Sequence, residues 1–498
     1  MLKVLTAPQI KELDAYTIRH EPIPSIDLME RACRAFVTWF TEKFESSKKI
    51  GIVCGTGNNG GDGLCIARVL NDRNYAVKVW IVRGGSESED FRTNLKRLPV
   101  KLKPLDVTSP VSHEIFAGCD VLIDALFGSG LSRALDGIYA EAVSAMNNAD
   151  ATRVAVDIPS GLFADKHDAG VVLRAHHTVS FQLPKLAFFM PENYPYTGEW
   201  HVVKIGLHKD FIQSAVTAHH LTERKDIVSM LKPRSKFSNK GTFGKALLIA
   251  GSYGKMGAAV IAARAAMRSG LGLLTVHVPI CGYPIIQTAV PEAMASIDPH
   301  EHFFTAIPSL EGYDVIGIGP GLGHERETVE AFRSILEHTN KPMVIDADAL
   351  NIVSANRELL SIIPENSILT PHPKEFERLV GKWKDDFERL DKVQEFASRI
   401  KSIIVLKGAF TSVVSPDGNV YFNPTGNPGM ATGGTGDLLT GILTGCLAQR
   451  YSSLEAALVG VFLHGLAGDF AVKTKSMEAL VATDLLEFLP HAFLSLRA

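Results

Sequence analysis

Residues 48–74 read KKIGIVCGTGNNGGDGLCIARVLNDRN, and this stretch decides the fold of the first half of the chain. It begins with an apolar, β-branched run, passes through a glycine-rich loop and ends in a helical pattern of apolar residues. A strand that leads through a tight glycine loop into a helix is the first unit of a parallel sheet with crossover helices. The stretch therefore predicts an α/β domain.

Similar β-branched runs alternate with helical patterns along the whole chain. These runs cover residues 75–84, 119–128 and 152–161 in the first half, and 244–252, 313–321, 341–349 and 402–410 in the second. Strand signals thin out between about residues 206 and 240, in a polar and mixed segment. We therefore expect two different α/β domains, a Rossmann-like three-layer domain over residues 1–217 and a second three-layer domain over residues 222–498.

Composition indicates a globular, soluble protein. The chain has 498 residues, of which 46% are hydrophobic and 21% charged, and its net charge is −3 without a long basic run. Nucleic acid is therefore not expected as a partner. The N-terminus lacks the apolar core of a signal peptide, and no run of about 18 apolar residues occurs. We expect a cytoplasmic protein without membrane association. The six cysteines are scattered without a C-x-x-C pair, which argues against a zinc knuckle or a disulfide framework.

A second glycine-rich stretch, NPGMATGGTGDLLTGILTG at residues 427–445, contains one acid, Asp437. The pattern of residues 438–450 predicts a helix, so the glycines lie at a helix start. Unpaired N–H groups and the helix dipole favour an anion there, and residues without a Cβ let a phosphate approach closely. The stretch predicts a phosphate held next to a possible base. The structural alternative is that Asp437 merely caps the helix.

The second half contains no P-loop motif, so a nucleotide would have to be bound elsewhere. Its candidate phosphate-binding segments are residues 251–259, 317–323 and 427–445. Between them, the segments DADALN (346–351), TPHPKE (370–375) and VLKGAFT (405–411) follow predicted strands. His372 alone is typical of a rigid loop, and Lys407 alone could be a surface cation. Their positions at successive strand ends of a glycine-lined domain favour a binding site.

The loop of the first half contains Gly55, Gly57 and Gly60 in the order G-x-G-x-x-G. This fingerprint alone is weak evidence for a dinucleotide site. A redox Rossmann domain usually has an acid at the end of its second strand, whereas this chain has Arg83. Arg83 suits NADP, or a site that makes no ribose contact.

Oxygen-bearing side chains gather at three predicted strand ends of the first half. They are Asn58, Asn59 and Asp62 after the first strand, Asp124 after another, and Asp157 with Ser160 after a third. Carboxylate, amide and hydroxyl oxygens suit a hard cation, and one or two carboxylates suit a weakly held monovalent ion. No histidine or cysteine converges there, which argues against zinc or copper at these strand ends. Each residue alone could be a turn or cap residue.

Two histidine pairs remain outside these sites. Adjacent residues on a strand point to opposite faces, so we interpret His176–His177 and His219–His220 as structural or surface residues.

The motifs of the first half together resemble one family. NNGGDGLCIARVL, DALFGSG, DIPSGL and IPSIDLMERA look like the YjeF N-terminal family, the NAD(P)H-hydrate epimerases. The resemblance implies potassium ligands at Asn59, Asp124 and Ser160. It also implies substrate contacts from Asn58, Asn59, Gly60, Gly61, Asp62, Gly128, Ser129, Gly130, Leu131, Ser132, Arg133, Ala134 and Asp157, the last against the damaged nicotinamide.

The second half resembles the ribokinase-like NAD(P)H-hydrate dehydratases over about residues 222–498. The motifs that carry the resemblance are KGTFGKALLIAGS, GAAVIAARAAMRSGLGLLTV, GPGLG, DADALN, TPHPKEFERL, LKGAFT and NPGMATGGTGDLLTGIL. The resemblance implies a nucleotide cradle of Lys407, Gly408, Ala409, Phe410, Thr411, Asn427, Gly433, Gly434, Thr435 and Gly436. It implies that the hydrated nicotinamide faces Ala258, Gly321, His372 and Asp437.

These resemblances imply a bifunctional enzyme whose substrates are the hydrates NADHX and NADPHX with ADP or ATP. We expect Asp437 to take the hydroxyl proton while the backbone N–H groups of residues 434–436 stabilise the transferred phosphoryl group. ADP with Mg²⁺ is the preferred donor, and ATP is the alternative. The first domain would interconvert the R and S hydrates with K⁺ bound, and Asp157 would handle the proton. We also expect a homo-oligomer.

Three rival hypotheses remain at this point. A ribokinase-like kinase for a sugar or a hydroxymethylpyrimidine would share the acid of the G-x-G-D motif but does not account for the first domain. A nucleotide-sensing scaffold has no need of clustered carboxylates such as Asp62, Asp124 and Asp157. A Rossmann dehydrogenase lacks an evident hydride-transfer partner.

Overall fold

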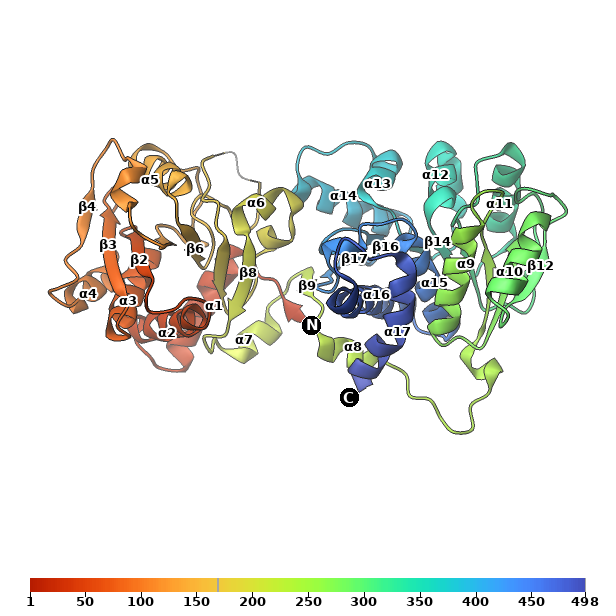
Figure 1. The fold of residues 1–498 in the computed structure, drawn as a ribbon, viewed down its shortest axis with the longest axis horizontal. Helices are drawn as coiled ribbons and strands as arrows, with labels where there is room; N and C mark the ends of the chain where they lie inside the picture. Colours follow the sequence, from red (N-terminus) through yellow and green to blue (C-terminus); the bar gives the residue numbers. More distant parts are fainter. Residues whose placement is uncertain (168–169, 498) are drawn as a thin grey trace. The chain divides into compact units, whose positions relative to one another are not determined.

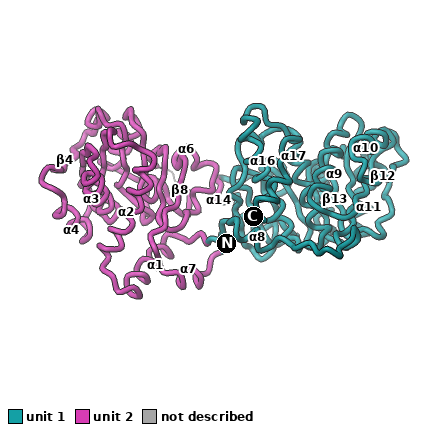
Figure 2. The backbone as a smooth tube through the Cα atoms, turned by 60° about the horizontal axis from the view of Figure 1, so that its bottom comes forward, with its two compact units in different colours: residues 1–2, 218–384, 388–498 teal, residues 3–217, 385–387 magenta. Residues whose placement is uncertain are grey.

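A computed structural model describes residues 1–167 and 170–497. The chain divides into two compact units, which Figure 2 shows in different colours. The first unit comprises residues 3–217 with 385–387, and the second comprises residues 1–2, 218–384 and 388–498. The division falls after residue 217, where the predicted first domain ends. Strand β9 (His219–Leu221) belongs to the second unit and takes up residues that the prediction had left between the domains.

The first unit is built on a parallel sheet. Among the described residues, this sheet has seven strands in the order β4-β3-β2-β5-β6-β7-β8. Their bounds are β2 Lys49–Cys54, β3 Ala76–Val82, β4 Leu105–Val107, β5 Val121–Ala125, β6 Thr152–Val156, β7 His177–Phe181 and β8 Glu199–Val203. All neighbouring strands are parallel, so their carboxyl ends meet at one edge.

Helices cover both faces of this sheet (Figure 1). They are α1 Ala7–His20, α2 Ser25–Lys43, α3 Asn58–Asp72, α4 Glu89–Arg97, α5 Gly137–Asn148, α6 Tyr194–Thr197 and α7 Lys209–Ser214, with 3-10 turns at His113–Phe116, Leu186–Phe189 and Pro191–Asn193. Phe36 of α2 and Leu64 of α3 pack with Ile52 and Ile123 in one core. Residues of α5 such as Met146 pack with strand residues of the opposite face in a second core. The unit is therefore a three-layer domain.

The second unit contains a larger mixed sheet. Among the described residues it has eleven strands in the order β1-β9-β18-β17-β16-β15-β14-β13-β10-β11-β12. The further bounds are β1 Leu2–Lys3, β10 Lys245–Ile249, β11 Leu273–Val278, β12 Met294–Ile297, β13 Val315–Ile318, β14 Met343–Ile345, β15 Ile368–Leu369, β16 Ile403–Leu406, β17 Ser412–Val414 and β18 Val420–Phe422. The strands from β12 to β16 along this order are parallel, and β17 is antiparallel to both of its neighbours.

The helices of the second unit are also arranged on both sides of its sheet (Figure 1). They are α8 Arg224–Met230, α9 Met256–Arg268, α10 Tyr283–Ala289, α11 Arg326–His338, α12 Ala347–Ala355, α13 Pro373–Val380, α14 Asp386–Arg399, α15 Thr435–Ala448, α16 Ser453–Lys475 and α17 Ala482–Arg497, with 3-10 turns at Lys240–Phe243, Ile280–Gly282, Arg357–Ile362 and Pro428–Met430. Helices α15, α16 and α17 share one core with β14 to β17.

Helix α15 packs unusually close to α9. A Cβ added at Gly441 would lie 2.1 Å from the carbonyl oxygen of Ala262, and one added at Gly445 would lie 2.7 Å from the Cβ of Ser269. The two glycines are four residues apart and lie on one face of the helix. Gly441 and Gly445 therefore allow α15 to contact α9, whereas the glycines before the helix form the loop that leads into it.

Helix α16 is an internal core element. Among the described residues, it is the one helix long and apolar enough to cross a membrane, yet 67% of its most apolar window is buried inside the structure. Buried residues such as Phe462 and Leu463 join the core shared by α15 and α17.

The predicted strand runs are confirmed as β2, β3, β5 and β6 in the first unit and as β10, β13, β14 and β16 in the second. The α/β fold class with two three-layer domains is also confirmed. All six cysteines are free, and five of them are buried.

Candidate active sites

A cavity of about 1290 Å³ lies at the carboxyl ends of the first unit's strands. It is lined by the start of α3, by the loop after β5 and by residues that follow β6 and β7. The structure brings together many of the predicted substrate residues here. Those that line the cavity are Asn58, Asn59, Asp62, Gly128, Ser129, Gly130, Leu131, Ser132, Arg133, Ala134 and Asp157.

Gly60 and Gly61 do not line this cavity, although the resemblance implies that both contact the substrate. Both are buried in the first turn of α3. A Cβ at Gly60 would lie 1.9 Å from the carbonyl oxygen of Gly55, and a Cβ at Gly61 would lie 3.1 Å from the sulfur of Met29. Their lack of a Cβ therefore allows the helix to start close to β2, and their contact with the substrate stays a prediction.

Asp157 follows β6 and has a φ of 68°, which is rare for a residue with a side chain. Its Oδ1 accepts hydrogen bonds from Lys185 Nζ at 2.5 Å and from the Phe181 backbone N–H at 3.1 Å. The Lys185 side chain is fully buried. Burial alone would raise the pKa of Asp157, but the charge and hydrogen bond of Lys185 hold it below its usual value. Asp157 is therefore a carboxylate at neutral pH.

Two further acids line the same cavity, Asp14 of α1 and Asp62 of α3. Burial and then the negative charge of Asp157 raise the pKa of Asp14 to about 7. The same two causes hold the pKa of Asp62 well above its ordinary value. The cavity thus combines one carboxyl group whose pKa is lowered with two whose pKa values are raised, a combination suited to acid–base chemistry.

Asn59, Asp124 and Ser160 lie at neighbouring positions beside this cavity. Ser160 Oγ donates to Asp124 Oδ1 at 2.7 Å and accepts from the Phe127 backbone N–H at 2.9 Å. Asn59 lies against Gly128, because a Cβ added there would be 3.5 Å from Asn59 Oδ1. Both amide atoms of Asn59 are buried and have no hydrogen-bond partner among the described residues. Such an orphaned amide beside a fully buried carboxylate fits a cation with oxygen ligands.

The second candidate site surrounds the start of α15. Its N-cap is Gly434, with a φ of 90° and no side-chain cap hydrogen bond, and Asp437 lies in the first turn. Burial and then the charge of Asp346 raise the pKa of Asp437 to about 6, against the lowering effect of Lys407. The helix-cap alternative for Asp437 therefore has no hydrogen bond to support it in this structure.

Lys407 follows β16, and its side chain lies next to the first turn of α15. Its Nζ donates to Asp346 Oδ1 at 3.0 Å and lies 3.8 Å from Glu375 Oε2. Thr440 Oγ1 donates to the other oxygen of Asp346 at 2.6 Å. A Cβ added at Gly436 would lie 3.6 Å from Lys407 Nζ. Lys407 is therefore a cation inside the site and is held there by two buried acids.

Ala258 and Gly321 are neighbours in the structure. A Cβ at Gly321 would lie 3.2 Å from the Cβ of Ala258, and the φ of 62° at Gly321 favours glycine. His372 is the N-cap of α13, where its Nδ1 accepts from the backbone N–H groups of Lys374 and Glu375 at 3.1 and 3.3 Å. His372 therefore caps α13, and its Nε2 lies 3.5 Å from Glu375 Oε1.

The predicted nucleotide cradle is formed by two loops. In the loop after β16, Thr411 Oγ1 donates to the Gly408 carbonyl at 3.0 Å. In the loop before α15, Asn427 donates to Asp469 at 3.0 Å and accepts from a backbone N–H. A Cβ added at Gly408 or at Gly433 would have no described atom within 4 Å. Both backbones are thus open to a ligand.

Comparison with known proteins covers both units. Residues 25–187 match the family model described as "YjeF-related protein N-terminus", and residues 246–491 match the model described as "NAD(P)H-hydrate dehydratase". The bifunctional NAD(P)H-hydrate repair enzyme of Moorella thermoacetica is 36% identical over 99% of this chain and 97% of its own length. The enzyme of the same name from Coxiella burnetii is 35% identical over 97% of each chain. The chain belongs to the bifunctional NAD(P)H-hydrate repair enzyme family.

A solved structure supports the fold of the second unit of this repair-family chain. A ribokinase-like superfamily protein from Enterococcus faecalis is 30% identical, with a TM-score of 0.51, and the match covers 57% of this chain and 98% of that one. The ribokinase-like fold expected for the dehydratase half of the repair family is confirmed.

Sequence reasoning missed several residues of these repair-family sites. Lys185 and Asp14 line the first cavity, and Asp346 and Glu375 hold Lys407 in the second site. The position of Lys185 within the apolar run LPKLAFFM was a usable signal, because a lysine there needs a buried acid. Asp14 gave no such signal, since it lies on an amphipathic helix among other charged residues.

Proposed function

We propose that this chain repairs hydrated nicotinamide nucleotides. The second unit would dehydrate the S hydrates of NADH and NADPH at the expense of ADP, and the first unit would interconvert the R and S hydrates. The observation that carries the proposal is Asp437, a half-buried acid in the first turn of α15 beside Lys407. Membership of the repair family supports the pairing of the two activities in one chain.

In the second unit, Asp437 would accept the proton of the substrate hydroxyl, whose oxygen then attacks the terminal phosphoryl group of ADP and releases AMP. The backbone N–H groups of residues 434–436 and the Lys407 ammonium would stabilise the charge on this group. The lone pair of the ring nitrogen then expels phosphate. Loss of a proton from the adjacent ring carbon restores the double bond of NAD(P)H. ATP is the alternative donor and would release ADP.

Mg²⁺ would accompany the nucleotide. Carboxylate oxygens suit this hard cation, and Asp346 and Asp437 are two acids whose charges act on Lys407 in this site. Bound with the nucleotide, the ion would neutralise charge on the phosphates. Lys407 already balances Asp346, which leaves Asp437 to serve as the base.

In the first unit, Asp157, whose pKa is lowered, and Asp14, whose pKa is raised to about 7, would handle the proton exchanged during epimerisation. Lys185 keeps Asp157 ionised and fixes its direction through the 2.5 Å hydrogen bond. Asn59, Asp124 and Ser160 would hold K⁺, as the orphaned amide of Asn59 supports. Replacing K⁺ by a bulky organic cation should slow epimerisation, and zinc bound at these residues would contradict the proposal.

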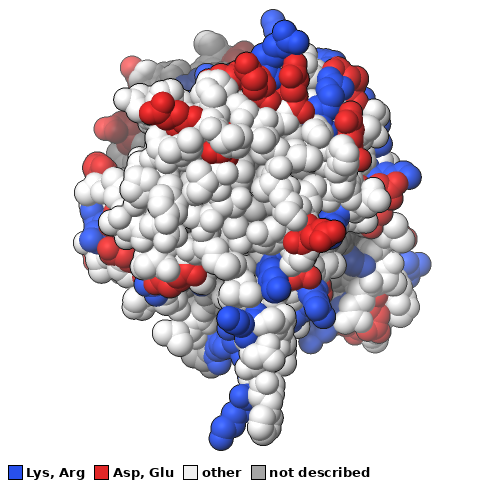
Figure 3. Space-filling model, turned by 90° about the vertical axis from the view of Figure 1, so that its right-hand side faces the viewer, with Lys and Arg blue, Asp and Glu red and all other residues white. Residues whose placement is uncertain are grey.

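We further propose a cytoplasmic homo-oligomer that binds neither nucleic acid nor membranes. The side of the second unit that includes α10 and β12 has few charged side chains at its centre (Figure 3). Edge strand β12 exposes Met294 to 50% and Ile297 to 41%, and Ile285 of α10 is 41% exposed. An apolar sheet edge of this kind favours association with another copy. Met294→Lys with Ile297→Lys should lower the mass measured by light scattering, and an unchanged mass would contradict this interface.

One experiment tests the central proposal. The chain is incubated with chemically hydrated NADH and ADP or ATP in the presence of K⁺ and Mg²⁺, and absorbance of the restored nicotinamide is followed. With ADP, the S hydrate should be consumed directly and the R hydrate through the first unit. A chain that phosphorylates sugars or hydroxymethylpyrimidine but leaves the hydrate unchanged would overturn the proposal in favour of a kinase.

A further inference from the structure

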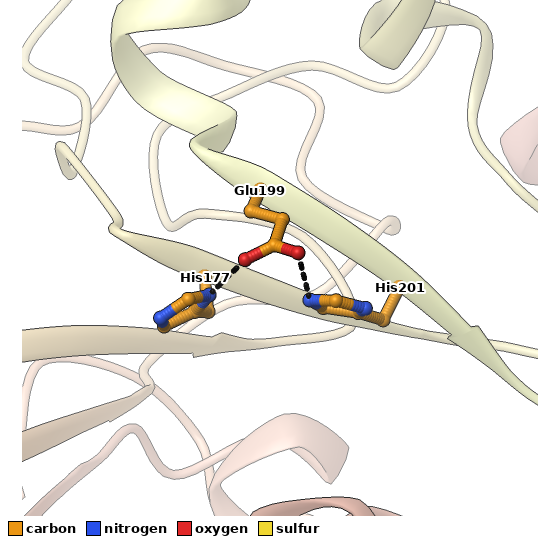
Figure 4. A group of neighbouring side chains, drawn as sticks. All are labelled: His177, Glu199 and His201. Atoms are coloured by element: carbon orange, nitrogen blue, oxygen red, sulfur yellow. Dashed lines mark ion pairs between the residues drawn. The ribbon is translucent and has the colours of Figure 1, made fainter. Parts of the chain in front are cut away.

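A cluster of two histidines and one glutamate lies in the first unit, outside the cavity described above. His177 begins β7, and Glu199 and His201 lie on the neighbouring strand β8 (Figure 4). The parallel register pairs His177 with Glu199, and His201 follows two residues later. Residues two apart on a strand share a face, so all three side chains project from one side of the sheet. The cluster lies at the amino ends of the strands, whereas the cavity lies at their carboxyl ends.

The three side chains converge on a common point. His177 Nδ1 lies 3.3 Å from one carboxylate oxygen of Glu199, and His201 Nε2 lies 3.6 Å from the other. The candidate ligand atoms all lie within 4.8 Å of one another. Ligand atoms of a tetrahedral ion bound at about 2.0–2.2 Å are separated by roughly 3.4 Å, so small side-chain rotations would close the site.

Both histidine nitrogens that face Glu199 lack a hydrogen bond. His177 Nδ1 and His201 Nε2 are buried, and neither has a hydrogen-bond partner among the residues that the structure describes, although both lie near Glu199. Buried polar atoms are rarely left in this state without a ligand.

Aromatic rings and one lysine surround the cluster. The ring of Trp39 on α2 lies 5.0 Å from His201 and 5.7 Å from His177, and Phe44 lies 6.1 Å from His177. Lys43 Nζ lies 3.3 Å from Glu199, whose side chain is 59% exposed. An exposed pair of this kind contributes little stability, so an incoming cation can displace the lysine.

We propose that His177, Glu199 and His201 bind one divalent transition-metal ion of the zinc class. Two imidazoles and a carboxylate suit this class of ion, and water would complete four ligands. The ion would tie edge strand β8 to β7, because each strand contributes a ligand. Mg²⁺ is not expected here, since it prefers oxygen ligands.

The test is equilibrium dialysis of the full chain against zinc chloride in buffer with excess Mg²⁺. Wild-type protein should bind one zinc ion per chain. His177→Gln and His201→Gln should each lower the affinity for this ion at least about tenfold. The matched control is His167→Gln. His167 also lies beside a glutamate, at 3.1 Å from Glu192, but no second histidine among the described residues joins this pair to form a group of metal ligands. The control should bind zinc as the wild type does.

A second measurement separates this site from binding by cysteine. Co²⁺ in place of zinc should give visible bands of tetrahedral nitrogen and oxygen coordination without a thiolate charge-transfer band. Zinc should also raise the midpoint of thermal unfolding of the wild type but not of Glu199→Gln, which changes an exposed residue and keeps the fold. Equal zinc binding by wild type and both histidine variants, a thiolate band, or no bound zinc would each overturn the proposal.

Discussion

The chemistry of the second unit depends on a single side chain. Asp437 keeps a half-buried carboxylate beside Lys407 and makes no cap hydrogen bond. Its pKa of about 6 is raised by burial, which suits a base that works near neutral pH. The raised value also means that ionisation of Asp437 opposes folding, because the folded state favours the protonated form.

Asp437→Asn should lower the dehydration rate by about 10²–10⁴-fold, the usual contribution of a general base. In the wild type, the rate should rise with pH through about 6 as Asp437 ionises. The midpoint of thermal unfolding should not fall at pH 7.5, since the variant removes a charge whose ionisation opposes folding. Rates are measured at saturating ADP. A variant that dehydrates the S hydrate near the wild-type rate would show that Asp437 is structural.

Asp157 and Lys185 form a buried pair, and removing one partner leaves the other charge uncompensated. Lys185→Met should therefore destabilise the first unit by about 3–5 kcal/mol and abolish epimerisation. The double variant Lys185→Met with Asp157→Asn should recover much of the stability without the activity. Thermal unfolding of the full chain, followed by circular dichroism, measures this change in the stability of the first unit. Equal stability of the two variants would argue against coupling between the side chains.

At the scale of elements, prediction from sequence succeeded where a pattern was local. The strands β2, β5, β10 and β14 carry their signal in continuous apolar runs, because both faces of each strand are buried. The edge strand β8, with the sequence EWHVV, has no such run and was not predicted. Lys407, Asp437 and the segment that contains Asp346 followed from motifs, whereas the ion pair of Asp346 with Lys407 became visible only once folding had brought distant segments together.

The contact between α15 and α9 gives a prediction of its own. Replacing a helical glycine by alanine usually stabilises a helix by up to about 1 kcal/mol. At Gly441 we expect the opposite, a loss of about 1–3 kcal/mol, because the new methyl group meets Ala262 at 2.1 Å. Gly257→Ala in α9 is the matched control, since no described atom outside its own helix turn lies within 4 Å of its added Cβ. Thermal unfolding that ranks Gly441→Ala at or above the wild type would contradict this packing.

At the scale of the whole molecule, the two units have separate cores and separate candidate sites. Every residue that lines the first cavity lies between residues 7 and 207, and every residue named in the second site lies between residues 258 and 469. We therefore expect each unit to function when it is expressed alone.

Residues 1–217 and 218–498 should each give a soluble, folded fragment with one of the two activities. A second fragment that begins at residue 222 should be less stable than one that begins at 218, because it lacks β9, which pairs with β18 through His219, His220 and Leu221. Circular dichroism and the two activity assays provide the comparison. Failure of both fragments to fold would contradict the boundary.

The separation of the two sites has an evolutionary consequence. A gene that encodes this chain could be cut near codon 217, or assembled from two ancestors, without changing any residue proposed to contact a substrate. The match between the second unit and a protein of which it covers 98% shows that such a half exists as a chain of its own. Selection can therefore adjust the expression of the two activities independently, or lock their ratio at one to one by keeping the genes fused.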